Sequence, residues 1–216
     1  MSDRCTKFYP ASRQLVAKHI ITHWPPALNT SPRFLLIGNL VSIHNMPFTQ
    51  VISFTGTEIS FISHYLLSTE VRYEVVVLHV GSNCCKSQTF MSEFIELIAV
   101  VKQRSIFVDT EVWICSLLPR PFDCGEIIVI EGIEISVDDR LVSLNKKLRN
   151  VAEKIPCCTF LKTYMPFRKV SDPAVRAMFS ESGYDHLLPI GWLRLRRFIL
   201  GALHNFHPQQ SVPILK

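Results

Sequence analysis

Short apolar runs and helix-like spacing alternate along most of the chain. The runs are rich in Val, Ile, Leu and Phe, and they stop at Gly, Pro or small polar residues. Such runs are typical of strands buried on both faces, whereas apolar residues three and four positions apart are typical of helices that bury one face. We predict strands at residues 33–38, 50–54, 75–80, 111–118 and 158–164.

The segments around these strands show the helical spacing. Pro25 and Pro26 end the first such segment sharply, and residues 55–57 (Thr-Gly-Thr) are expected to cap the second. Helices are predicted at residues 12–24, 57–67, 88–104 and 137–155, with a last one after Pro189.

The alternation of strands and helices predicts the fold class. Right-handed crossovers connect such strands into a parallel sheet, so we expect an α/β three-layer sandwich with a five-stranded parallel sheet and helices on both faces. Residues 126–136 break the rhythm, and Gly132 between two alternating runs predicts a small inserted hairpin. No repeat, low-complexity tract or linker is visible. One domain is therefore expected over residues 1–216, with a helical extension at 1–32, a core at 33–203 and a tail at 204–216.

Composition places the chain among ordered globular proteins. Of its 216 residues, 48% are hydrophobic and 19% are charged. No apolar run approaches the ~18 to 20 residues that a membrane span needs, and the N-terminus lacks the apolar core of a signal peptide. We expect a soluble, cytoplasmic protein.

The cysteine and histidine patterns indicate neither a disulfide framework nor a metal site. The seven cysteines include two adjacent pairs but no C-x-x-C spacing, so buried reduced thiols are expected. The histidines lack metal-ligand spacing with Asp or Glu, and His79 falls on a predicted buried strand, where a structural role is expected. No cofactor and no metal are predicted.

Positive charge is concentrated near the C-terminus. Residues 1–155 carry 15 Lys and Arg against 15 Asp and Glu, whereas residues 156–216 carry 8 against 3. A polyanionic partner is expected to bind at this last segment.

Polar and small residues gather where the predicted strands end, which is where open parallel sheets bind their ligands. Three of these loops read Gly-Asn-Leu at 38–40, Thr-Gly-Thr at 55–57 and Gly-Ser-Asn at 81–83, and Asp-His-Leu stands at 185–187. In order and spacing this set resembles the SGNH (GDSL-type) hydrolases over roughly residues 33–203.

The resemblance implies where the catalytic groups would lie. In that family the first loop supplies the serine nucleophile, the next two supply a Gly and an Asn of the oxyanion hole, and the last motif supplies a histidine base with an aspartate three residues earlier. Gly56, Asn83 and His186 match these positions, but the nucleophile position is Leu40 and the aspartate position is Gly183. Such a site lacks the attacking atom of acyl transfer, so we expect a degenerate site and no enzyme activity.

Two alternatives stay open at this stage. An active or residual esterase, including the esterase domains of retrotransposon proteins, would need Ser42 or Cys84 as its nucleophile. A two-residue displacement into a following helix would turn Ser42 away from its base, and a thiol on Cys84 is expected to be buried. The other alternative is a scaffold that binds a peptide in the former substrate cleft.

Basic residues follow the last predicted strand. Lys162, Arg168 and Lys169 alternate there with Tyr164 and Phe167. Cations that contact phosphates, together with aromatic rings that stack on bases, are what single-stranded nucleic acid requires. This stretch therefore favours RNA binding.

Three arginines lie in the last predicted helix. At about 100° per residue, Arg194 and Arg197 fall opposite the apolar face, and Arg196 falls near its edge. The fold is expected to bring residues 162–169 near the end of this helix. We predict that the RNA-binding residues are Lys162, Arg168, Lys169, Arg194, Arg196 and Arg197.

An SGNH-like fold without its serine and with a basic C-terminal surface resembles the OSK-domain family of insect germ-plasm proteins. That resemblance implies a non-enzymatic module that binds single-stranded messenger RNA, chiefly in 3′ regions. It also implies a place in cytoplasmic ribonucleoprotein granules, with other granule proteins as further partners and no membrane.

Overall fold

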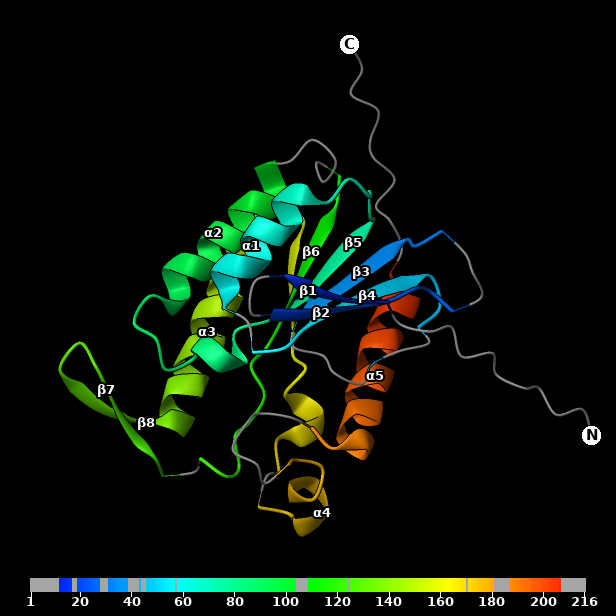
Figure 1. Cartoon of the computed structure of the whole chain (residues 1–216). Helices are drawn as coiled ribbons and strands as arrows, with labels where there is room; N and C mark the ends of the chain where they lie inside the picture. Colours follow the sequence, from blue (N-terminus) through cyan, green and yellow to red (C-terminus); the bar gives the residue numbers. More distant parts are fainter. Residues whose placement is uncertain are drawn as a thin grey trace, which may run out of the picture.

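The computed structural model describes most of the chain in ten segments. These are residues 12–16, 19–27, 31–38, 43, 46–56, 58–103, 109–123, 125–169, 171–180 and 187–206. Figure 1 shows a central sheet between two layers of helices.

The central sheet has seven strands in the order β1-β2-β4-β3-β5-β6-β9. The five strands from β4 to β9 are parallel, and their spatial order is second, first, third, fourth and fifth along the chain. This is the doubly wound order of flavodoxin-like folds, which confirms the predicted parallel sheet. The bounds of the parallel strands are Phe34–Gly38 (β3), Thr49–Phe54 (β4), Val75–His79 (β5), Glu111–Cys115 (β6) and Cys158–Leu161 (β9).

Helices cover both faces because the parallel strands are apolar on both faces. In β3, for example, Leu35 and Ile37 pack into one core with α1, α2 and α3, whereas Phe34 and Leu36 pack into the other with α5. Figure 1 shows the same division of the helices on either side of the sheet. The helices are Ile59–Ser68 (α1), Phe90–Gln103 (α2), Val137–Lys154 (α3), Pro173–Arg176 (α4) and Pro189–His204 (α5), with short 3-10 turns at Ser82–Cys84 (η1) and Met165–Phe167 (η3).

The cap predicted for α1 differs in the structure. The helix begins at Ile59 with Glu58 as its N-cap residue, and no side chain there accepts a capping hydrogen bond. Thr57 lies outside the described residues. By contrast, α3 begins at a true side-chain cap, because the Asp139 backbone N–H donates to Ser136 Oγ at 3.1 Å.

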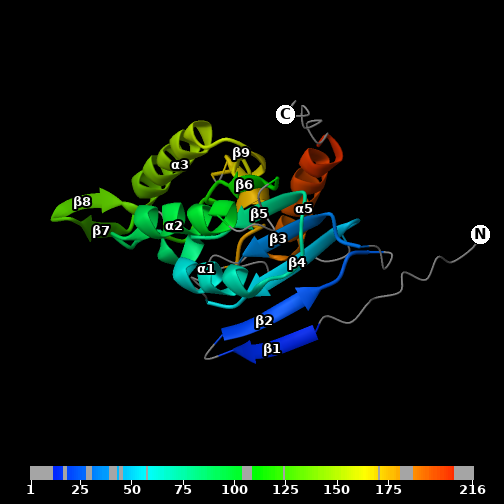
Figure 2. The ribbon, with the colours of Figure 1, turned by 90° about the horizontal axis from the view of Figure 1, so that it is seen from above.

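The predicted N-terminal helix is wrong. Two antiparallel strands lie in this segment, Ser12–Val16 (β1) and His19–Trp24 (β2), and β2 pairs antiparallel with β4. The expected helical extension at 1–32 is therefore replaced, over its described residues, by sheet. Figure 2 shows this hairpin beyond β4, where it continues the sheet. Pairing with an open strand edge satisfies main-chain groups over the whole segment, and that tertiary gain overrides a short helical spacing.

The predicted inserted hairpin is confirmed. Its strands are Ile127–Ile130 (β7) and Ile133–Ser136 (β8), and they lead directly into α3. Both views show the hairpin projecting from the body of the molecule (Figures 1 and 2). Across the described residues, no helix combines the length and apolar character needed to cross a membrane.

Candidate functional site

The carboxyl end of β3 lies against β5 at the point where the strand order reverses. A side-chain carbon at Gly38 would clash with the backbone carbonyl of His79, and the backbone of Gly38 has a φ of 153°. A glycine is therefore required for the two strands to approach this closely. Open α/β sheets place their ligands in the crevice beside such a reversal point.

Part of the predicted degenerate site lies outside the described residues. Leu40 and His186 are in this group, as are Ser42 and Gly183. Their assignment as nucleophile, base, alternative nucleophile and missing aspartate stays a prediction from the sequence.

The other two predicted positions occupy neighbouring loops. Gly56 is exposed with a φ of 63°, and Asn83 is exposed in η1. A backbone hydrogen bond links Ile59, at the start of α1, to the Cys84 thiol, so the loops after β4 and β5 meet. The matched Gly56 and Asn83 thus lie in two loops that contact each other. These loops follow β4 and β5, the strands on either side of β3.

Cys84 has little of the character of a nucleophile. The residue is buried, and burial raises the pKa of its thiol above the usual value, which outweighs the opposing effect of the hydrogen bond with Ile59. A cysteine attacks as the thiolate, so a raised pKa lowers its reactivity at neutral pH. The expectation of a buried thiol is confirmed at this position.

Two arginines, Arg120 and Arg140, donate hydrogen bonds to the loop after β5. Buried Arg140 donates from Nε to the carbonyl of Cys85 at 3.2 Å and from Nη2 to the carbonyl of Ser87 at 2.9 Å. Arg120 donates to the Cys85 sulfur at 3.2 Å, and its Nε lies 2.7 Å from an Asp123 oxygen. These cations are used for internal support, so they do not present charge to a ligand.

The cations predicted from the sequence to bind RNA, here called the C-terminal cations, are mostly exposed. Five of the six have exposed side chains, and Arg196 is half-buried. They lie on the segment after β9 and on α5, and η3 packs against α5. Figure 1 shows η3 beside the N-terminal half of α5, so the expected neighbourhood of the two segments is confirmed. The exposed residues are Lys162, Arg168, Lys169, Arg194 and Arg197.

Arg196 has the intermediate position that the helical spacing predicted. Burial lowers the pKa of its guanidinium, and the charge of Arg197 lowers it further. Arg194 faces outward, and its Nη1 lies 3.6 Å from the sulfur of Met178.

The two aromatic rings predicted to stack on bases differ in the structure. Phe167 is completely buried and packs edge-on against Phe179 with ring centroids 5.5 Å apart, so its ring is not available to a ligand. Tyr164 is half-buried and lines a cavity. Of this pair, only Tyr164 has a ring that a ligand could reach, and its stacking on a base stays a prediction.

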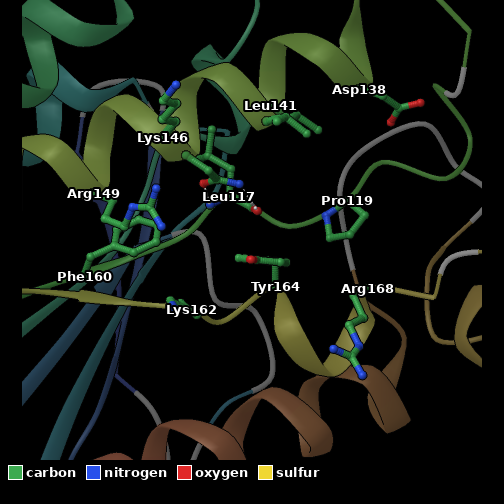
Figure 3. Close-up of a pocket in the computed structure, with 12 residues that line it drawn as sticks. Leu117, Pro119, Asp138, Leu141, Lys146, Arg149, Phe160, Lys162, Tyr164 and Arg168 are labelled. Atoms are coloured by element: carbon green, nitrogen blue, oxygen red, sulfur yellow. Dashed lines mark hydrogen bonds between the residues drawn. The ribbon is translucent and has the colours of Figure 1, made fainter.

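That cavity lies beyond the carboxyl ends of β6 and β9, between α3 and the segment that leads into η3. Its volume is about 450 Å³. Figure 3 shows Arg149 on α3 and Tyr164 on the opposite wall, whereas the amino group of Lys146 and the guanidinium of Arg168 point away from the space between the walls, at its margin. The lining residues are Leu117, Pro119, Asp138, Leu141, Val142, Asn145, Lys146, Arg149, Phe160, Lys162, Tyr164 and Arg168.

Hydrogen bonds fix both walls of the cavity. Asn145 of α3 accepts from the Leu117 backbone N–H at 2.7 Å and donates to the Leu117 carbonyl at 3.1 Å. On the other wall, buried Thr163 donates to the Ser116 carbonyl at 2.9 Å, and the Tyr164 backbone N–H donates to Ser116 Oγ at 2.8 Å. The end of β6 thus holds α3 on one side and the segment after β9 on the other.

The cavity combines an apolar floor with a basic rim. Four cations and one carboxylate, Asp138, are among its lining residues, and within the described residues the salt bridge of Arg149 is a long 3.9 Å contact with Glu153. Within the described residues, the side chains of Lys146, Lys162 and Arg168 have neither a salt bridge nor a hydrogen bond to another residue. Unpaired cations around an apolar floor suit an anionic ligand with a flat apolar part.

Sequence reasoning found half of this rim. Lys162 and Arg168 were predicted, whereas Lys146 and Arg149 were missed because α3 was interpreted only as an amphipathic helix. The signal was the cluster of basic residues at 146, 147 and 149 on a helix that directly precedes the last strand. Among the described residues, no group of three His, Cys, Asp or Glu side chains is arranged to hold a metal ion.

Solved structures resemble this arrangement. A protein from Streptococcus pneumoniae described as a platelet activating factor superposes with a TM-score of 0.58 and 14% identity, over 82% of this chain and 86% of that chain. The salicylyl-acyltransferase SsfX3 from a tetracycline biosynthetic pathway superposes with a TM-score of 0.54 and 10% identity, over 84% of this chain and 57% of that chain. The chain has an SGNH-hydrolase-like fold.

This structural likeness confirms the fold that the strand-end motifs predicted. At these low sequence identities, it says nothing about activity or ligands. A comparison with protein-family models gave no match, and a comparison with curated proteins gave none either.

Proposed function

We propose that the chain is a non-enzymatic RNA-binding module built on an SGNH-hydrolase-like fold. The C-terminal cations contact the phosphates of single-stranded RNA, and Tyr164 supplies an aromatic surface for a base. Messenger RNA in germ-plasm granules is the proposed target, by the resemblance to the C-terminal domain of the insect protein Oskar.

The observation that carries this proposal is unbalanced, exposed positive charge on two adjoining segments. Lys162, Arg168, Lys169 and Arg197 are exposed, and within the described residues no carboxylate pairs with their side chains. Elsewhere among the described residues, the exposed Arg33 and Arg72 have acidic partners, at 2.7 Å from Glu74 and 2.6 Å from Asp109, whereas the exposed Arg176 lies over the Phe122 ring. Cations without partners gain most from a polyanion, because phosphate contact releases counterions.

The proposed loss of catalysis rests on the residue types at the matched positions. Leucine at position 40 and glycine at position 183 supply neither a nucleophile nor an orienting carboxylate. Cys84, the alternative nucleophile in the described part of the site, is a buried thiol with a raised pKa. A retained Gly56 and Asn83 without an attacking group act as scaffold.

RNA binding is tested by measuring the affinity for a fluorescent single-stranded RNA at several salt concentrations. Contact with phosphates predicts that the affinity falls steeply with salt, with a log–log slope of about −0.7 for each neutralised phosphate. Affinity that does not change with salt, or no binding below the high micromolar range, would refute the proposal.

Esterase activity is the rival, and it is tested separately. The parent protein and its Ser42→Ala and Cys84→Ala variants are incubated with short-chain nitrophenyl esters and with a fluorophosphonate probe. We expect no turnover and no labelling in any of them. Labelling that disappears in one variant would identify the nucleophile and would overturn the non-enzymatic assignment.

The cellular part of the proposal needs its own experiment. Ultraviolet crosslinking in germ-line cells, followed by sequencing of the bound RNA and mass spectrometry of the crosslinked peptide, would report both partners at once. We expect messenger RNA fragments, enriched in 3′ regions, attached to peptides from residues 158–206. Crosslinks confined to other parts of the chain would contradict the assigned surface.

A further inference from the structure

We propose that the cavity between α3 and η3 holds one unstacked nucleotide of the bound RNA. The base enters the apolar floor beside Tyr164, and the basic rim holds the phosphates on either side of it. This inference rests on the proposed function for its ligand and shares Lys162, Tyr164 and Arg168 with it, but it adds a second wall, because half of the rim belongs to α3.

The size and the lining of the cavity select the ligand class. A volume of about 450 Å³ falls within the range of roughly 300 to 1,000 Å³ that is typical of small-molecule sites. Leu117, Leu141 and Phe160 give an apolar floor, and half-buried Tyr164 adds an aromatic ring. An inorganic anion would leave this floor unused, whereas a nucleobase covers it, since every base has an apolar face that stacks on aromatic rings.

The charge of the rim matches phosphates on both sides of one base. Lys146 and Arg149 stand on the α3 wall, and Lys162 and Arg168 stand on the wall after β9 (Figure 3). One acidic residue, Asp138, reduces the net charge of the lining to about +3, counting each Lys and Arg as +1 and the Asp as −1. A backbone that crosses from one wall to the other therefore meets cations before and after the inserted base.

The same geometry explains why the base must be unstacked. Hydrogen bonds of Asn145 to Leu117 and of Thr163 to Ser116 hold the walls, so we expect the opening to keep its width and to exclude a duplex. Sequence-tolerant proteins that bind single strands gain much of their affinity from such stacked bases. The cavity thus favours loops and single strands over paired RNA.

Val142 offers a clean way to close the cavity. Its side chain lines the cavity but is 70% exposed, so a larger residue there fills the opening without entering the core. Val142→Trp blocks the entrance and leaves every charge in place. Asn150→Trp is the matched control, because Asn150 is exposed on the same helix and is not part of the lining.

The experiment compares three ligands on the parent and both variants, whose folding is first checked by thermal unfolding. The ligands are a single-stranded RNA of eight nucleotides, an abasic oligomer of the same length and charge, and uridine 5′-monophosphate. We expect Val142→Trp to weaken RNA binding about tenfold, the loss of one stacked base, and to abolish binding of the mononucleotide. Binding of the abasic oligomer is expected to be the same in all three proteins, and Asn150→Trp is expected to match the parent throughout.

The outcomes separate this inference from the proposed function. Equal RNA affinities of the parent, Val142→Trp and Asn150→Trp would overturn the nucleotide cavity and leave RNA binding in place. Binding of the mononucleotide that Val142→Trp abolishes would support the cavity even if the longer RNA did not bind, in which case the proposed function fails alone. A short acidic peptide serves as a further ligand on the same three proteins. Binding of this peptide that Val142→Trp abolishes, without mononucleotide binding, would overturn the cavity proposal in favour of a peptide site.

A measurement on the parent protein avoids dependence on any variant. RNA that carries 4-thiouridine is crosslinked and the modified peptide is identified by mass spectrometry. We expect peptides from residues 137–154 and 158–169 to carry the base. Crosslinks confined to residues 189–204 would place the bases elsewhere and would refute the inference.

Discussion

Two regions at the carboxyl ends of the strands differ in the contacts that their cations make. At the reversal point, where β3 and β5 finish, cations face inward and hold the backbone: Arg140 donates to the Cys85 and Ser87 carbonyls. Where β9 finishes, the cations Lys162 and Arg168 line a cavity and have no partner among the described residues. We call the first the closed region, and the second, whose cations lack partners among the described residues, the incomplete region. The proposed function places the ligand at the incomplete region because its charges are the ones left available.

The largest expected effect comes from breaking the closed region. Gly38→Ala should destabilise the fold by about 4 kcal/mol or more, because the added carbon clashes with the backbone carbonyl of His79 rather than with a movable side chain. Urea unfolding, followed by circular dichroism, measures the change. Gly56→Ala is the control: its φ is also positive, at 63°, but the added carbon meets nothing within 4 Å, so a loss of only about 1 to 2 kcal/mol is expected. Equal losses in the two variants would show that close packing at the reversal point is not needed.

The second effect is a pH dependence from the same region. Burial lowers the pKa of His79 to about 4, from about 6.5 in the unfolded chain. The unfolded state binds the proton first as the pH falls, so the free energy of unfolding is greatest above pH 6.5 and decreases toward pH 4. The loss amounts to about 1.4 kcal/mol for each pH unit, or up to about 3 kcal/mol for this histidine.

Urea unfolding at pH 7 and pH 4.5 measures that dependence. Replacement of His79 by Leu should remove most of the difference between the two pH values, whatever its effect on stability at pH 7. A smaller decrease of the same sign is expected to remain, since burial also lowers the pKa of half-buried His23. An unchanged difference in His79→Leu would contradict the assignment.

The third effect concerns the incomplete region. Arg194→Glu combined with Arg197→Glu should weaken RNA binding for all sequences and reduce the salt slope by about 1.4, which corresponds to two phosphates. Stability should change little, because exposed charges contribute at most about 1 kcal/mol each. The control reverses Arg33 and Arg72, which have the acidic partners Glu74 and Asp109 and lie at the opposite ends of the strands. If the Arg194/Arg197 variant bound RNA like the parent, the basic face of α5 would be an ordinary solvated surface.

The smallest effect is expected from Arg196. This side chain is half-buried, so Arg196→Ala removes packing as well as charge and should lower the melting temperature by roughly 2 to 4 °C, the equivalent of about 1 kcal/mol. Differential scanning calorimetry measures it. Arg197→Ala, on the exposed face of the same helix, should leave the melting temperature within about 1 °C of the parent. Similar values for both alanine variants would place Arg196 among the solvated arginines.

The parallel core was predictable because its strands are runs of consecutive apolar residues, which are apolar on both faces. The run from Phe34 to Ile37 has no polar residue between its apolar ones, so neither face of the strand suits the surface. All four side chains are buried in the structure. The N-terminal hairpin was not predictable from local pattern. Apolar residues of 12–24 fit a helical spacing about as well as they fit strands, and the decision comes from the edge of β4, which is distant in sequence.

The site was only partly predictable for a similar reason. Exposed Lys162 and Arg168 were visible as a basic stretch, but periodicity alone did not show that Phe167 turns into the core while Tyr164 lines a cavity. The opposite wall comes from α3, which precedes β9 in the chain and is held to the end of β6 by Asn145. Which helix stands across from a loop depends on the sheet order, and the strand pattern does not specify that order uniquely.

The β1–β2 hairpin also bears on how far the N-terminus can be shortened before the fragment aggregates. A fragment that began at residue 33, where the sequence suggested that the core starts, would leave β4 as the outermost strand with its main-chain groups unpaired along one side. Five of the six residues of β4 are buried in the structure. In such a fragment, the unpaired edge of this apolar strand would be open to pairing with the same strand of another copy. We therefore expect the hairpin to protect the edge of β4, and we expect a fragment without it to aggregate at lower concentrations than the whole chain.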